Sequence, residues 1–162
     1  MQKFSVFQRS VLLAASPEEV FSFHEDPRNI RKISPPSLRV EKVACSVPAR
    51  VGDEFQLTVR QFGIRLEWIG FWEEIDRGHK LTDGAIKSPF LHWRHQHRFE
   101  PAGRDAKETL MTDRVEYALR EGILGTLADA TLIRMVLSLM FHARHRASRK
   151  YFSSGTIGKN TN

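Results

Sequence analysis

A long helical stripe at the end of the chain, after a series of strand-like segments, is the feature that most restricts its fold. From Gly122 onward, apolar residues recur at spacings of three and four, which is the period of one helix face. These residues are Leu124, Leu127, Ala128, Leu132, Met135, Val136, Leu139, Met140 and Ala143. A helix that continues to Phe152 would be roughly 45 Å long at 1.5 Å per residue. We expect its apolar stripe to lie against the rest of the molecule.

The sequence before this helix alternates between apolar and polar residues, as strands do when one face is buried. Candidate strands cover residues 3–13, 38–44, 54–62, 64–75, 79–86, 90–100 and 109–118. Short, turn-like connections between the last six are typical of antiparallel neighbours in a meander. Asp83-Gly84 is either a turn or a bulge. Ser16-Pro17 and Asp26-Pro27 each place a capping residue before proline, which predicts two short helices after the first strand.

These elements predict an α+β fold, in which a curved, seven-stranded antiparallel sheet wraps around the long C-terminal helix. A chain of 162 residues is one domain by size. We assign residues 1–152 to this domain and residues 153–162, which are small and polar, to a flexible tail. A sheet that grips a helix leaves a cleft between the two, and this cleft is the expected site.

Composition is that of an ordinary globular protein, with 41% hydrophobic and 27% charged residues. Cys45 is the single cysteine, so no intrachain disulfide forms, which fits a reducing compartment. The N-terminus lacks the apolar core of a signal peptide, and no stretch is apolar for the length of a membrane span. We therefore expect a cytoplasmic protein.

The net charge of +6 is partly local to residues 142–150. This segment carries Arg144, Arg146, Arg149 and Lys150 and no acidic residue. Such a cationic helix end complements the helix dipole, and the alternative is contact with an anionic membrane surface. Nothing in the sequence resembles a nucleic-acid-binding motif, so we expect no nucleic acid partner.

The segment SPFLHWRHQHRF, residues 88–99, places three histidines within six positions. Alternate residues of a strand share a face. The face expected to point into the cleft carries Leu91, Trp93, His95, His97 and Phe99. The solvent face carries Phe90, His92, Arg94, Gln96 and Arg98.

Asp113 in the next strand is expected on the same cleft face. A hairpin centred near Arg104 places His95 opposite Asp113, and a slip of two residues places His97 there. A carboxylate in an apolar cleft is costly without a partner, so we expect one of the two histidines to hydrogen-bond Asp113.

The role of His95, His97 and Asp113 stays open at this point. They form a structural or ligand-orienting group, a general acid/base site or a metal triad. No fourth ligand is spaced nearby, so the sequence predicts no metal. It also predicts no cofactor, because there is no phosphate-binding glycine loop.

The order of elements resembles the START-like superfamily, which includes polyketide cyclases and dehydratases, lipid-transfer domains and plant hormone-binding proteins. SPEEVFSF, DPRNIRKISPPS, SPFLHWRHQHRF and TLMTDRVEYALREGILG carry the resemblance, which covers residues 3–152. The chain is similar to small bacterial members described as cyclase/dehydrase-like or cell-division-inhibitor-like. Ser88 and Glu108 stand where that subgroup commonly has glycine, and Arg120 replaces a frequent proline. The resemblance implies a helix-grip fold with a hydrophobic cavity, but no single reaction.

Our leading hypothesis is a module that binds a hydrophobic or aromatic small molecule between sheet and helix. The predicted lining residues are Trp68, Trp72, Trp93, His95, His97, Phe99, Asp113, Tyr117, Met135 and Leu139. Gly70, between two tryptophans, is expected to leave space for the ligand.

Two alternatives belong to other classes. The first is a polyketide cyclase- or dehydratase-like enzyme with a cleft histidine as general acid/base. The second is a peripheral membrane or partner-binding protein that uses the basic helix end. The helix also has a second apolar flank, formed by Ala130, Ile133, Leu137 and Phe141. We expect this flank to contact strand edges, the short helices or a second subunit in a homodimer.

Overall fold

The computed structural model describes residues 4–61, 63–119 and 128–154. All seven predicted strands, both short helices and the long C-terminal helix are present. In chain order the elements are β1 (Ser5–Leu13), α1 (Pro17–Glu25), a 3-10 turn (Pro27–Asn29), α2 (Ile30–Ile33), β2 (Leu38–Cys45), β3 (Glu54–Gln61), β4 (Ile64–Asp76), β5 (Lys80–Lys87), β6 (His92–Ala102), a second 3-10 turn (Arg104–Ala106), β7 (Glu108–Ala118) and α3 (Ala128–Ser154). The helix thus includes the first two residues of the predicted tail, and the rest of that tail lies outside the described residues.

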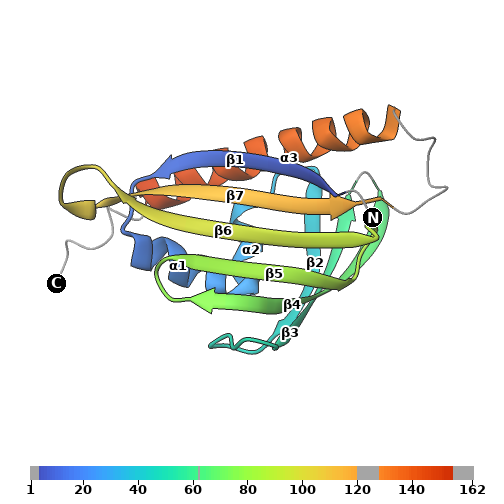
Figure 1. The fold of residues 1–162 in the computed structure, drawn as a ribbon, viewed down its shortest axis with the longest axis horizontal. Coiled ribbons are helices and arrows are strands. Elements are labelled where there is room, and N and C mark those ends of the chain that lie inside the picture. The colour runs from blue at the N-terminus through green and yellow to red at the C-terminus, as the bar shows by residue number, and fades with distance from the viewer. Residues whose placement is uncertain (1–3, 62, 120–127, 155–162) are drawn as a thin grey trace.

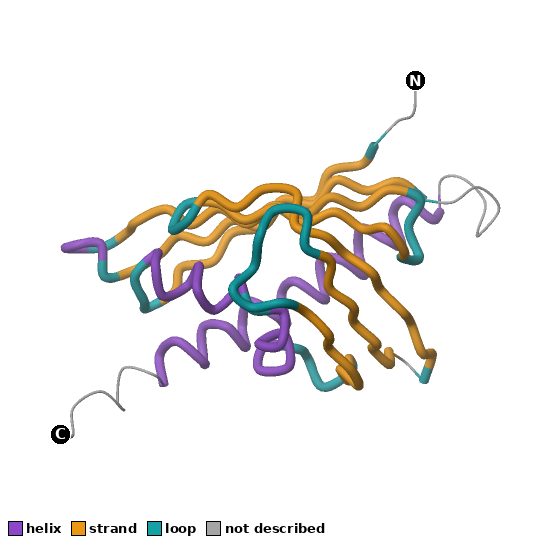
Figure 2. Tube along the Cα trace, turned by 90° about the horizontal axis from the view of Figure 1, so that it is seen from below, coloured by secondary structure: helices purple, strands orange, loops and turns teal. Residues whose placement is uncertain are grey.

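The strands form one antiparallel sheet with the order β1-β7-β6-β5-β4-β3-β2 (Figure 1). β2 to β7 are a meander of sequence neighbours, whereas β1 pairs with β7, from Ser5 opposite Tyr117 to Leu13 opposite Thr109. All three helices lie on one face of the curved sheet (Figure 2). α1 packs on β5, β6 and β7, and α3 packs on β1 and α2. The predicted α+β helix-grip fold is confirmed.

The predicted start of α1 is confirmed. The Ser16 hydroxyl accepts a hydrogen bond from the Glu19 backbone N–H, and the Glu19 carboxylate accepts one from the Ser16 backbone N–H. This capping box satisfies backbone donors that a helix N-terminus leaves unpaired. α1 can then bury Val20, Phe21 and Phe23 in the α1 side of the interior.

The face of α3 that packs on the sheet is not the one predicted. Leu132, Met135 and Leu139 are 43%, 52% and 64% exposed, whereas Leu137 and Phe141 of the second flank are 3% and 0% exposed. Both stripes are apolar, so periodicity alone does not fix the rotation of the helix. The second flank packs within its own chain and therefore gives no argument for a homodimer. Leu124, Leu127 and Arg120 lie outside the described residues.

The rotation of α3 can be tested by two substitutions on opposite faces. We expect Phe141→Ala to lower the free energy of unfolding by about 3–5 kcal/mol, because it leaves a cavity in the core. Leu139→Ala should change it by less than about 0.5 kcal/mol, because the side chain is exposed. Urea unfolding of both variants measures the difference, and similar losses would contradict this orientation.

No helix in the described ranges is long and apolar enough to cross a membrane.

Buried apolar side chains form two clusters on the concave face of the sheet. The α1 core comprises Val11, Leu13, Val20, Phe21, Phe23, Ile33, Ala49, Phe55, Trp72, Leu81, Phe99, Met111 and Phe152. The α3 core comprises Phe7, Trp93, Val115, Tyr117, Leu137 and Phe141. The interior is thus divided into two apolar regions.

Gly70 does not leave space for a ligand, contrary to the sequence-based expectation. A Cβ atom built on Gly70 would lie 2.3 Å from Cζ of Phe55, so the Phe55 ring fills this position. Phe55 also packs against Trp72, with ring centroids 5.1 Å apart. The glycine therefore permits close packing inside the α1 core.

Candidate functional site

Alternation along β6 places the histidine-rich segment as predicted. Trp93, His95, His97 and Phe99 are buried on the concave side. His92 and Arg94 are half-buried and Arg98 is exposed, so this strand has one inner and one outer face.

The predicted assignment of faces is wrong for the two residues just before β6, which begins at His92. Phe90, predicted to face solvent, packs inward, with its ring 4.8 Å from Trp93 and 5.9 Å from Tyr117. Leu91, predicted to face the cleft, is 49% exposed. Strand alternation does not extend to residues that precede the strand.

Asp113 on β7 binds the histidines of β6. The register pairs His97 with Asp113, which is the two-residue slip considered from the sequence. Nε2 of His95 donates a hydrogen bond to Oδ1 of Asp113 at 3.0 Å. Nδ1 of His97 lies 2.5 Å from the same oxygen but is not aligned for a hydrogen bond. The predicted histidine–Asp113 hydrogen bond is confirmed.

His145 on α3 is a third partner of this carboxylate, and the sequence analysis missed it. Its Nε2 donates to Oδ2 of Asp113 at 2.5 Å, and both side chains are buried. His145 lies four residues after Phe141, which lies four residues after Leu137, so all three share one helix face. A correct assignment of the buried face would have identified His145.

Asp83 on β5 is a further missed residue. It pairs with His95 across the two strands, and its Oδ1 lies 3.6 Å from Nδ1 of His95. The sequence analysis missed Asp83 because Asp83-Gly84 is typical of either a turn or a bulge. However, Leu81, Asp83 and Ala85 alternate onto one face, which would have placed the carboxylate inside. We refer to Asp83, His95, His97, Asp113 and His145 as the polar cluster.

Two more polar side chains border the polar cluster. Nδ1 of His24 donates to the backbone oxygen of Val20 at 2.7 Å, and the His24 ring lies 5.1 Å from the ring of His97. The Arg144 guanidinium lies 5.4 Å from the Phe141 ring centre and interacts electrostatically with Asp113 and Asp83.

Arg144 is half-buried and interacts with the polar cluster. Arg146, Arg149 and Lys150 are exposed. For all four residues, contact with an anionic membrane surface stays a prediction.

The two carboxylates of the polar cluster differ electrostatically. Burial raises the pKa of Asp83 to about 7, and the nearby His97 and Arg144 only partly offset this effect. Burial would also raise the pKa of Asp113. There, the electrostatic interaction with His97 and hydrogen bonds from His145 and His95 outweigh burial and hold the pKa well below its usual value. Asp113 is therefore ionised at neutral pH, whereas Asp83 is close to its midpoint.

The histidines nearest α1 are held neutral. Burial lowers the pKa of His24 to about 3, with a further contribution from His97. Burial and the neighbouring His95 also lower the pKa of His97. Uncharged imidazoles can accept a hydrogen bond or bind a metal through their unprotonated nitrogen.

The polar cluster lies between the α1 core and the α3 core. The His95 ring is 6.1 Å from that of Trp93 in the α3 core, and the His97 ring is stacked 6.1 Å from that of Phe99 in the α1 core. An aromatic wall extends from Trp93 on the α3 side. It comprises Trp68, Phe90, Trp93 and Tyr117. Trp68 and Phe90 are only half-buried.

The other predicted lining residues lie apart from this wall. Trp72 and Phe99 are buried in the α1 core. Met135 and Leu139 lie on the exposed face of α3, so their predicted position in the cleft is wrong. The wall and the polar cluster thus contain only part of the predicted set.

A second concave region, the end cleft, was not predicted. It has a volume of about 1170 Å³ and lies where α1, α2 and the last turns of α3 meet the loop between β6 and β7. Its walls include Phe23, Lys32, Lys107, Lys150 and Tyr151. This cleft is separate from the aromatic wall.

The curved antiparallel sheet with a long helix on its concave side defines a helix-grip domain of START-like architecture. The chain belongs to the family of polyketide cyclases/dehydrases and lipid-transport proteins, whose sequence profile matches residues 5–145. The resemblance to the START-like superfamily is thereby confirmed. No curated protein matches the chain significantly.

Solved structures with this fold include enzymes. The Zhui aromatase/cyclase from Streptomyces sp. R1128 has a TM-score of 0.73 and 16% identity, over 99% of this chain and 100% of that chain. A START superfamily protein from Mycobacterium smegmatis has a TM-score of 0.73 and 14% identity, over 92% and 97%. Norcoclaurine synthase from Thalictrum flavum, in complex with dopamine and hydroxybenzaldehyde, has a TM-score of 0.66 and 14% identity, over 99% and 90%. At these identities the similarity concerns the fold.

Proposed function

We propose that this protein binds a hydrophobic or aromatic small molecule against the aromatic wall, with the polar cluster next to the ligand's polar group. One observation carries the proposal: the ring of Trp93 contacts both Trp68, at 5.0 Å, and His95, at 6.1 Å. The apolar wall and the polar cluster are therefore continuous. Binding sites for small molecules commonly combine an apolar lining with a few fixed polar groups.

The half-buried members of the wall supply surface that a ligand can cover. Trp68 and Phe90 are in edge-to-face contact, with ring centroids 6.2 Å apart. Ile133 and Met140 of α3 are also only partly buried where they pack against the α3 core. Covering such side chains removes apolar area from water, which favours binding by about 25 cal/mol per Å² before the costs of association.

The family and its structural relatives support this class of ligand. The family description includes lipid transport, and the norcoclaurine synthase structure holds two small aromatic molecules. A planar ring with a hydroxyl or carbonyl group is therefore a reasonable probe. Such a ring can stack on the wall while its oxygen reaches a polar side chain.

Binding can be tested with 2-naphthol, a fused aromatic ring that carries one hydroxyl group. The chain has three tryptophans, so its ¹H–¹⁵N spectrum contains three indole N–H signals. We expect 2-naphthol to shift the signals of Trp68 and Trp93 more than that of Trp72, which is buried in the α1 core.

Two substitutions locate the probe. Trp68→Ala should weaken 2-naphthol binding at least about tenfold, because it removes an aromatic stacking surface. Tyr151→Ala, in the end cleft, is the matched control and should leave binding unchanged. The proposal is wrong if 2-naphthol does not bind at millimolar concentration, or if only Tyr151→Ala weakens binding.

An enzymatic role is the second candidate, and the surroundings of His95 favour it. This imidazole lies between two carboxylates, with Asp113 at Nε2 and Asp83 at Nδ1. Such an arrangement suits a general acid/base that moves protons during the cyclisation or dehydration of a polyketide. A poly-β-ketone thioester that cyclises with the wild type, but not with His95→Ala that still binds 2-naphthol, would favour the enzyme. Binding without turnover would favour the binding module.

A further inference from the structure

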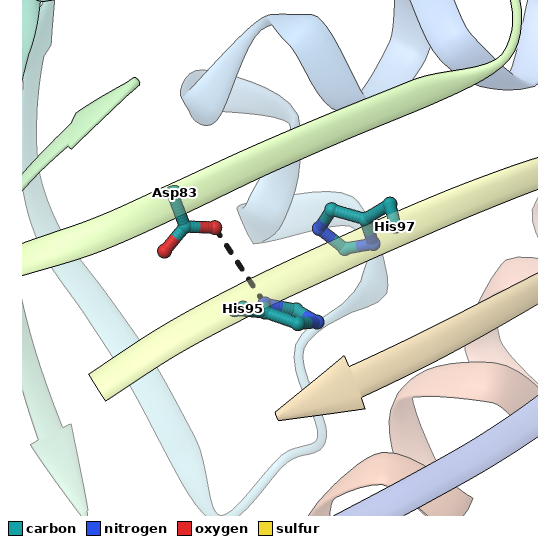
Figure 3. Close-up of side chains that lie close together, drawn as sticks. All are labelled: Asp83, His95 and His97. Atoms are coloured by element: carbon teal, nitrogen blue, oxygen red, sulfur yellow. Dashed lines mark ion pairs between the residues drawn. The ribbon is translucent and has the colours of Figure 1, made fainter. Parts of the chain in front are cut away.

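Three donor groups in the polar cluster converge on one point. Asp83, His95 and His97 each offer a ligand atom, and these atoms lie within 4.8 Å of one another. All three side chains are buried and come from the adjacent strands β5 and β6 (Figure 3). The rigid pairing of two strands, rather than a loop, holds the group together.

We propose that Asp83, His95 and His97 bind a divalent first-row transition ion. Bonds from such ions to imidazole nitrogen and carboxylate oxygen are about 2.0–2.2 Å, so ligand atoms on one ion lie about 3–3.5 Å apart. Nδ1 of His95 and Oδ1 of Asp83 are 3.6 Å apart, slightly beyond that spacing and too far for a hydrogen bond. Two imidazoles and one carboxylate suit zinc or ferrous iron better than magnesium or calcium.

Asp113 orients both imidazoles toward the proposed ion. It accepts the hydrogen bond of His95 through Nε2 and lies beside His97 at Nδ1. These contacts leave Nδ1 of His95 and Nε2 of His97 for the metal, and both rings present a nitrogen on the Asp83 side in Figure 3. A carboxylate behind a metal-binding imidazole fixes the ring and increases its basicity.

The charge balance of the site also favours a cation. Asp83 is a buried carboxylate that is only 8% exposed. Arg144 interacts electrostatically with Asp83, but among the described residues no ion pair within 4.0 Å joins the two side chains, and the buried Nε of Arg144 lacks a hydrogen-bond partner. An ion bound directly to Asp83 would stabilise the carboxylate form.

The proposal departs from the sequence-based prediction, which was no metal. The triad considered from the sequence used Asp113 as the third ligand. In the structure, Asp113 lies at Nε2 of His95, and Asp83 lies at Nδ1 of the same ring. Three protein ligands leave at least one coordination position for water or another molecule. The proposed ion site does not depend on binding of a small molecule to the aromatic wall.

The test uses the untagged full chain, stripped with a chelator and titrated with Co²⁺. We expect one equivalent to bind and to give the visible ligand-field absorption of protein-bound Co²⁺, and Zn²⁺ to displace it. Asp83→Asn should weaken Co²⁺ binding about 100-fold or more, because the amide is a poor ligand of nearly the same shape. This variant should fold, since it removes a buried ionisable group without changing volume.

His79→Ala is the matched control, because the His79 side chain is 74% exposed and lies outside the polar cluster. Its Co²⁺ affinity and absorption should equal those of the wild type. His95→Ala, checked for folding by circular dichroism, should lose the absorption band. The proposal is overturned if the wild type shows no band, or if Asp83→Asn and the wild type bind Co²⁺ equally well.

Discussion

Asp113→Ala is expected to lower the free energy of unfolding by about 3–5 kcal/mol, one of the largest effects of any single substitution in this protein. The Asp113 carboxylate is 1% exposed and contacts His95, His97 and His145. Its removal leaves the buried imidazoles of His95 and His145 without their acceptor, and each unsatisfied group costs about 1–3 kcal/mol. Urea unfolding at pH 7 measures the loss.

Two companion variants separate this effect from a general loss of carboxylate charge. Asp113→Asn keeps the volume and one acceptor oxygen, so its loss should be smaller than that of Asp113→Ala. Glu100→Ala removes an exposed carboxylate from β6 and should change stability by less than about 0.5 kcal/mol. A loss below about 1 kcal/mol for Asp113→Ala would show that the histidines find other partners.

His24 and Asp83 are expected to change the pH dependence of stability in opposite directions. The folded-state pKa of His24 is about 3, below the ordinary 6.5, so its contribution is present above pH 6.5 and lost as the pH falls toward 3. The folded-state pKa of Asp83 is about 7, above the ordinary 3.8, so its contribution is present below pH 3.8 and lost as the pH rises through 7. Each tenfold difference in proton affinity between the folded and unfolded chain corresponds to roughly 1.4 kcal/mol.

Single substitutions should expose these opposing effects. Between pH 7 and pH 4.5, His24→Phe should lose less stability than the wild type by about 2–3 kcal/mol, because it lacks the imidazole that takes up a proton only in the unfolded chain. Asp83→Asn should lose more than the wild type by a similar amount, because the compensating protonation is absent. The groups that face His24 are His97, Asp113 and Arg144. Urea unfolding at both pH values checks the prediction, and parallel pH profiles for all three proteins would contradict it.

Strand alternation explains why the sequence predicts one part of the polar cluster correctly. A strand repeats every two residues, so His95, His97 and Asp113 have only two possible faces, and the neighbouring Trp93 and Phe99 indicate which face is buried. The two-residue slip in register does not change that face. The inward direction of these side chains and their contact were therefore predictable.

Other members of the site depend on packing that a single sequence does not specify. α3 has two apolar stripes, and the one that lies against the sheet is selected by contacts with Phe7 and Trp93, which are distant in sequence. That rotation of α3 places His145 in the polar cluster and Arg144 beside it. His24 reaches the polar cluster only because α1 folds back over β6. Phe55 fills the position beside Gly70 from a neighbouring strand, which no local pattern reveals.

The pairing of β1 with β7 determines when this protein can fold during its synthesis. β3 to β7 can each pair with the strand made just before, whereas Ser5 to Leu13 must wait for the partners Thr109 to Tyr117. α3, which packs on β1, emerges from the ribosome later still. Its His145 reaches Asp113 only then, so a nascent chain that stops after β6 has neither a closed sheet nor a complete polar cluster. The first strand of such a chain exposes an unpaired edge, which favours aggregation until β7 is made.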